Sequence, residues 1–129
     1  NGNIYLVEQY RYPVEKRFWE LPQGSWEDTP DADHAVLAAG ELKEETGLVA
    51  KKMDYMGHQY HGYGYSSQGF HTYLATDLTM TSTNLDPEEE GLISRKFSLA
   101  EFEEMIVTGI IKDAVTVNAY GLAKIKGLI

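Results

Sequence analysis

The order of strand-like and helix-like segments restricts the fold of this chain more than any other feature. Five segments rich in β-branched and aromatic residues are typical of strands, and three segments with capping signals are typical of helices. The predicted strands span 3–12, 16–22, 51–61, 70–78 and 92–97; the predicted helices run from about 33 to 47, 99–108 and 114–126. Because the helices do not alternate regularly with the strands, we expect an α+β fold, an α/β/α sandwich around a mixed β-sheet.

Short local signals mark the ends of the predicted helices. Asp31 or Asp33 can cap the first helix, and Gly47 is a natural stop for it. Ser98 followed by Glu101 forms a capping box, and Asp113 can cap the last helix. The apolar side of the first helix is predicted to consist of Ala35, Val36, Ala38, Ala39 and Leu42.

Length, charge and cysteine content limit the classes of function. The 129 residues are expected to form one domain, 1–129. A net charge of −9 argues against nucleic acid as a partner, since phosphate backbones need a basic surface. No apolar run is long enough to cross a bilayer, and the first residues lack the regions of a signal peptide. The absence of cysteine removes disulfides and thiolate chemistry, and it fits a cytoplasmic protein.

Three glutamates lie close together near the end of the first predicted helix. Glu44 and Glu45 follow Glu41 by three and four residues, so the three carboxylates share one helix face. Their repulsion is unfavourable, and a hard divalent cation such as Mg²⁺ or Mn²⁺ would reverse it. A solvated helix face relieved by Lys43 accounts for the same pattern, and the spacing alone does not decide between them.

The wider pattern resembles the signature of the Nudix hydrolases. "ELKEETGL" (41–48) is similar to the second half of the Nudix box, and "ELPQG" (20–24) is similar to the segment that introduces the box in the ADP-ribose pyrophosphatase branch. The resemblance implies that Glu41, Glu44, Glu45 and the backbone carbonyl of Gln23 bind a divalent metal ion, Mg²⁺ or Mn²⁺. It also implies cleavage of a nucleoside diphosphate linked to a second group.

The chain departs from the Nudix pattern at two positions. Gly40 stands where the family has an arginine that orients the glutamates. The isolated glutamate of the box is missing, because counting forward from Gly24 reaches Pro30 and counting back from Glu41 reaches Ala32. Losing both residues would loosen metal binding or lower the rate, while the three principal carboxylates are kept.

The resemblance extends beyond the box. In "VEQYRYPV" (7–14), Arg11 matches a substrate-contacting arginine of the family, although a strand-end surface arginine is the plainer interpretation. The resemblance also places Glu20 and Gln68 at the substrate. In "DPEEEG" (86–91), Glu88 matches the general base and Glu90 matches a further metal ligand. A solvated acidic loop explains that cluster equally, and Glu89 between them is the alternative register. The resemblance also implies a catalytic role for Glu44.

Together these features predict a metal-dependent hydrolase that cleaves the pyrophosphate bond of ADP-ribose or another nucleoside diphosphate sugar. One alternative is a Nudix hydrolase of nucleoside triphosphates, NADH or dinucleoside polyphosphates. A second is a nucleotide-binding domain without turnover, which Gly40 and the missing box glutamate favour. The third and weakest is an acidic metal-buffering domain. Members of the ADP-ribose branch usually have further N-terminal strands, which build their dimer, before the segment that matches 3–12. This chain starts almost at that segment. A homodimer is therefore a weaker expectation from the resemblance. No histidine spacing suggests zinc.

Overall fold

A computed structural model describes residues 2–24, 33–81 and 91–129 of the chain. The strands are β1 (Asn3–Arg11), β2 (Lys16–Glu20), β3 (Leu48–Tyr60), β4 (Gly69–Met80) and β5 (Ile93–Ser98). The α-helices are α1 (His34–Thr46), α2 (Leu99–Val107) and α3 (Ala114–Ile125), and a short 3₁₀ helix, η1, covers Tyr12–Val14. The predicted elements are confirmed; the largest shift is at β3, which begins at Leu48 directly after the glycine that ends α1.

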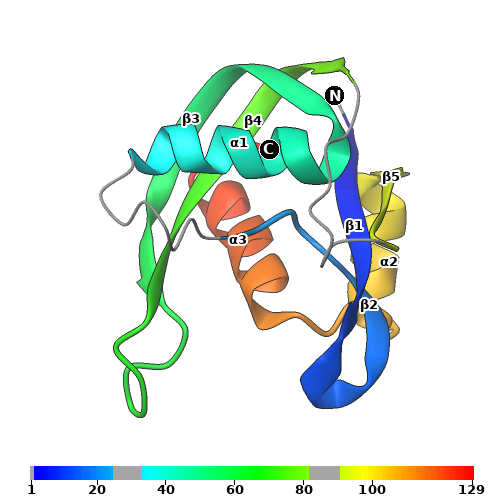
Figure 1. The fold of residues 1–129 in the computed structure, drawn as a ribbon, viewed down its shortest axis with the longest axis vertical. Coiled ribbons are helices and arrows are strands. Elements are labelled where there is room, and N and C mark those ends of the chain that lie inside the picture. Colours follow the sequence, from blue (N-terminus) through cyan, green and yellow to red (C-terminus); the bar gives the residue numbers. More distant parts are fainter. Residues whose placement is uncertain (1, 25–32, 82–90) are drawn as a thin grey trace.

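The strands form two antiparallel sheets. The first has the order β2-β1-β5, and the second is the β3-β4 hairpin. All pairings among the described residues are antiparallel, so the parallel neighbours of a mixed sheet are not found there. The α+β class of the prediction is confirmed. Figure 1 shows α1 crossing between the hairpin and the start of β1, with α3 in the middle of the molecule.

The helix ends follow the local signals. Asp33 accepts hydrogen bonds from the N–H groups of Ala35 and Val36, at 2.8 and 3.4 Å, while Asp31 lies outside the described residues. Gly47 ends α1 with a φ of 77°, a left-handed conformation that favours glycine. The Ser98–Glu101 capping box forms in both directions, and Asp113 caps α3. These predictions are therefore confirmed.

Both faces of the central strand β1 are covered. Leu6 and Val7 are each 0% exposed, and consecutive residues of a strand point to opposite faces. Leu6 belongs to the main core with Phe97, Phe102 and Ile111. This core joins the sheet to α2 and to the chain before α3. Val7 lies on the other face, directly opposite Glu20 of β2. That second face carries the polar residues described below.

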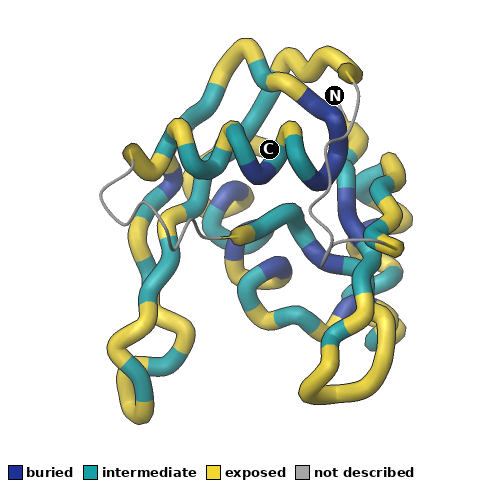
Figure 2. Tube along the Cα trace, viewed as in Figure 1, coloured by how far each residue is buried: buried dark blue, intermediate teal, exposed yellow. Residues whose placement is uncertain are grey.

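The buried side of α1 differs from the prediction. Its buried residues are Glu41, Glu45 and Thr46, whereas Val36 is 58% exposed and Ala39 is exposed. The helix packs mainly on the hairpin, and its C-terminal half faces the interior (Figure 2). The predicted apolar side was therefore wrong at Val36 and Ala39, because tertiary packing decides which stripe of a short helix is covered.

The hairpin reaches beyond the rest of the molecule. Figure 1 shows its tip, around residues 62–68, at the far end from α1. The tip is largely exposed (Figure 2), with Tyr63 and Tyr65 at 84% and 85% exposure. Among the helices that the structure describes, none has the length and apolar character needed to cross a membrane.

Candidate active site

Two of the three predicted glutamates of α1 point into the protein. Glu41 is 8% exposed and Glu45 is 2% exposed, while Glu44 is half-buried. Buried carboxylates are unfavourable unless a partner offsets the loss of hydration. Helices normally cover their aliphatic side, so a helix that buries carboxylates at this spacing has a functional explanation more readily than a structural one.

The segment after β2 lies directly against the Glu41 carboxylate. A Cβ atom added to Gly24 would be 2.5 Å from the Cδ and one Oε atom of Glu41, and 2.8 Å from the other oxygen. The predicted "ELPQG" segment therefore meets the glutamate helix, and a side chain at position 24 would require the Glu41 carboxylate to move. This contact also brings the Gln23–Gly24 backbone next to the carboxylate.

Arg11 and Glu20 form an ion pair on the polar face of the first sheet. The Nε of Arg11 donates to Glu20 at 3.0 Å, and its Nη2 donates to the other carboxylate oxygen. Glu20 also accepts from the side-chain amides of Gln9 and Gln23, at 3.4 and 3.0 Å. The hydrogen bond to Glu20 raises the pKa of Arg11, and the fields of Asp113 and Glu45 add to that effect.

This pairing gives Glu20 close partners within the protein. Its side chain is only 3% exposed, against 41% for Arg11, and its oxygens accept from donors of β1 and from Gln23. A carboxylate held in this way can position Arg11, and contact of Glu20 with a substrate stays a prediction. Arg11 is not the isolated strand-end arginine of the plainer interpretation.

The donor set at the α1 face fits a hard divalent cation. Oxygen ligands from carboxylates suit Mg²⁺ and Mn²⁺, and Mg²⁺ commonly keeps several waters while using one or two carboxylates. Glu41 and Glu45 supply two buried carboxylates. The Gly24 backbone lies so close to the Glu41 carboxylate that a Cβ atom would take up the position between them. Within the described ranges, no three His, Asp or Glu side chains form a group that could hold one ion. The two buried glutamates are therefore the core of the candidate site.

The described structure does not test the positions predicted for the acidic loop, and it places Gln68 at the hairpin tip. Glu88 and Glu90, with Glu89 between them, lie outside the described residues. Gln68 is exposed at the hairpin tip, where its backbone N–H donates to Ser66 at 3.1 Å. Figure 1 places that tip far from α1, so the chain does not bring Gln68 to Glu41 or Glu45. A role of Gln68 at the substrate stays a prediction.

A histidine cluster that sequence reasoning missed lies where α1 meets the hairpin. The rings of His34 and His71 stack with centroids 3.7 Å apart, and the centroid of His58 is 4.7 Å from that of His71. The hydroxyl of Tyr55 lies 3.0 Å from Nδ1 of His71. The strand register pairs His58 with His71, and the packing of α1 on the hairpin adds His34. Desolvation lowers the pKa of His71, and the neighbouring His34 and His58 lower it further.

The histidine cluster predicts a loss of stability in acid. Because the pKa of His71 in the folded protein lies below the ordinary 6.5, the unfolded chain binds more protons between these two values. The free energy of unfolding should therefore fall as the pH drops from 6.5, until His71 is also protonated in the folded state. The effect should be small because His71 is exposed. Urea unfolding at pH 7.5 and pH 5 measures it.

The variant His71→Gln should reduce this pH dependence. His61→Gln is the matched control, since His61 contacts Phe70 at 4.9 Å outside the cluster. Equal pH dependence in the wild type and His71→Gln, or an equal reduction in His61→Gln, would contradict the assignment to His71.

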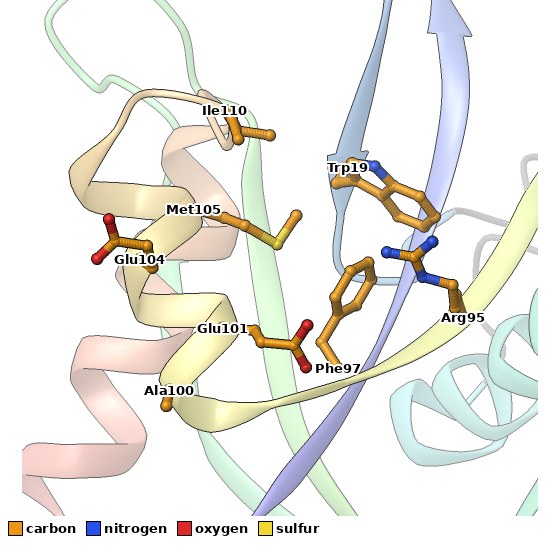
Figure 3. Close-up of a pocket in the computed structure, with 8 residues that line it drawn as sticks. All are labelled: Trp19, Arg95, Phe97, Ala100, Glu101, Glu104, Met105 and Ile110. Carbon is orange, nitrogen blue, oxygen red and sulfur yellow. The ribbon is translucent and has the colours of Figure 1, made fainter.

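A hollow lies on the face of the first sheet that is opposite to Arg11 and Glu20. It has a volume of about 600 Å³ and is lined by Trp19, Arg95, Phe97 and residues of α2. Figure 3 shows Arg95 beside the two rings, with its guanidinium carbon 4.4 Å from the centroid of Phe97 and 5.4 Å from that of Trp19. Trp19 precedes Glu20 on β2 and points the other way, so this hollow is separate from the glutamate face.

Comparison with known proteins gives matches over most of the chain. The family model described as NUDIX domain matches residues 1–115. An "ADP-ribose pyrophosphatase" of Bacillus subtilis is 27% identical over 97% of this chain, and one of Mycobacterium tuberculosis is 31% identical over 91%. A "Methanol dehydrogenase activator" of Bacillus methanolicus is 32% identical over 92% of it.

The chain is shorter than the relatives that it matches. It spans 67% of the Bacillus subtilis protein, 56% of the Mycobacterium tuberculosis protein and 63% of the Bacillus methanolicus protein. A solved structure titled "Crystal structure of ADP compounds hydrolase" superposes with a TM-score of 0.85, at 23% identity, over 99% of this chain and 69% of that one. At this identity the likeness supports the fold alone.

Proposed function

The chain belongs to the NUDIX family, and from this membership we propose that it hydrolyses the pyrophosphate bond of a nucleoside diphosphate derivative. ADP-ribose or another nucleoside diphosphate sugar is the proposed substrate, in line with the names of two relatives. The observation that carries the proposal is the burial of Glu41 and Glu45 on the side of α1 that meets Gly24.

Enzymes of this family generally need a divalent metal ion, and we propose Mg²⁺ or Mn²⁺. Such an ion neutralises phosphate oxygens and lowers the pKa of an attacking water. Glu41 and Glu45 are the proposed principal ligands. Glu44, the backbone carbonyl of Gln23 and Glu90 are proposed to complete the set.

The other residues of the proposed site bind and orient the substrate or move a proton. Arg11 uses Nε and Nη2 to bind Glu20, and a guanidinium has five N–H donors, so further donors remain for a phosphate. Glu20 holds the plane of that guanidinium and thereby sets where a phosphate binds. Glu88 is proposed to take the proton of the attacking water, with Glu44 as the second catalytic carboxylate.

A nucleotide panel assayed with Mg²⁺ and with EDTA tests this proposal. We expect release of AMP from ADP-ribose, dependent on the added metal ion and faster than turnover of NADH, nucleoside triphosphates or dinucleoside polyphosphates. Preference for one of those three classes would replace the proposed substrate with another NUDIX activity. A cytoplasmic location, a homodimer and a single domain over 1–129 stay predictions.

One observation favours a second candidate, a domain that binds a nucleotide without cleaving it. Gly40, in α1, has no side chain with which to orient the glutamates as the expected arginine would. Thermal stabilisation by ADP-ribose without any turnover in the same panel would favour this candidate.

A further inference from the structure

The start of α3 is bonded to the segment that carries Gly24. Thr116 is 0% exposed, and its hydroxyl oxygen accepts a hydrogen bond from the backbone N–H of Leu21 at 3.0 Å. The same hydroxyl donates to Asp113 at 2.7 Å. One buried hydroxyl therefore joins two parts of the chain that are 95 residues apart in the sequence.

A second connection runs through the Gln23 side chain. Its amide nitrogen is 3.0 Å from Glu20 and 3.5 Å from the Oδ2 of Asp113 that Thr116 also contacts. Asp113 is therefore linked to Leu21 through Thr116 and to Gln23 directly. Together the two connections bond Leu21 and Gln23 to the start of α3, immediately before Gly24.

These contacts do more than cap the helix. Capping of α3 needs only the bond from the backbone N–H of Thr116 to Asp113, at 3.1 Å. The bond that the Thr116 hydroxyl accepts from the Leu21 N–H is not part of that cap. This bond instead restricts the positions of the three residues that follow Leu21. Those residues end at Gly24, whose clearance from the Glu41 carboxylate is too small for a Cβ atom.

We propose that Thr116, together with Asp113, is a positioning residue of the active site, which holds Leu21–Gly24 against the Glu41 carboxylate. The inference rests on the proposed function, because it assumes that Glu41 binds the metal ion. Thr116 acts through the backbone of another segment and touches neither the metal ion nor the substrate. Partners of this outer kind commonly change metal affinity on the order of 10–100-fold when they are removed.

The test compares Thr116→Val, which keeps the shape and removes the hydroxyl, with Thr116→Ser, which keeps the hydroxyl. Ala123→Gly is the matched control, because Ala123 is buried in the same helix and a glycine there destabilises α3 without changing these bonds. Two quantities are measured for each protein: direct Mn²⁺ binding by electron paramagnetic resonance in the absence of substrate, and the Mn²⁺ concentration that gives the half-maximal rate. Thermal unfolding records the stability of each variant.

We expect Thr116→Val to weaken Mn²⁺ binding on the order of tenfold and to raise the half-maximal Mn²⁺ concentration in parallel. Thr116→Ser should retain the wild-type values, and Ala123→Gly should lower only the unfolding temperature. Wild-type Mn²⁺ affinity in Thr116→Val, an equal loss in Ala123→Gly, or no Mn²⁺ binding by the wild type would overturn the inference. Mn²⁺ binding that weakens as expected, in a protein that turns over no nucleotide, would instead refute the proposed function alone.

Discussion

Replacing Glu45 by glutamine is expected to lower kcat by more than roughly 100-fold in the presence of Mg²⁺, while the fold is retained. Removal of residues that only support a metal ligand costs about 10–100-fold, and a ligand itself should cost more. Glutamine keeps the volume of this side chain, which is 2% exposed, and removes its charge.

Three measurements check this result: steady-state turnover of ADP-ribose, Mn²⁺ binding and thermal unfolding without metal ions. Glu104→Gln is the matched control, since it makes the same chemical change at an exposed position of α2. That control should keep the wild-type rate. A Glu45→Gln variant with an unchanged rate would remove Glu45 from the metal site. A variant that does not fold would show that the carboxylate serves the structure first.

The second large effect is expected for Gly24→Ala. The added Cβ would be 2.5 Å from the Glu41 carboxylate, so either that carboxylate or the backbone after β2 must shift. Because the atoms in the way are the end of a flexible side chain, the cost in unfolding free energy should be smaller than the roughly 1–3 kcal/mol that is typical of overpacking in a core. Displacing a metal ligand should also weaken Mn²⁺ binding on the order of 10–100-fold. The two effects are measured by urea unfolding and by Mn²⁺ titration.

Gly121→Ala is the control for this second prediction. A Cβ at Gly121, within α3, meets nothing within 4 Å, so alanine should stabilise the protein by about 0.5–1 kcal/mol through helix propensity. Its rate and its Mn²⁺ binding should match the wild type. If Gly24→Ala also keeps wild-type Mn²⁺ affinity, then Gly24 does not determine where the Glu41 carboxylate lies.

Most of the secondary structure could be predicted from the sequence because its signals are local. The Ser98–Glu101 capping box forms over three residues, and Gly47 ends α1 through its own φ angle. The closeness of Glu41 and Glu45 also follows from helix geometry alone, since residues four apart share a face. The family resemblance could also be identified from the sequence, because "ELPQG" and "ELKEETGL" are short continuous segments.

Contacts between distant segments could not be predicted in this way. The histidine cluster depends on the register of β3 and β4, which pairs residues 58 and 71. The ion pair of Arg11 with Glu20 depends on the register of β1 and β2. Gln68 lies at the tip of a hairpin whose length carries it away from α1.

The sequence by itself therefore determined the order of the elements, the helix ends, the shared face of the glutamates and the family. Tertiary structure alone decided that α1 buries its carboxylates and exposes Val36, that Gly24 lies against Glu41, and that Thr116 bonds the segment before it. The physical reason is that helix geometry and capping involve neighbours within four residues. Burial and the pairing of distant polar groups are set when separate elements pack together.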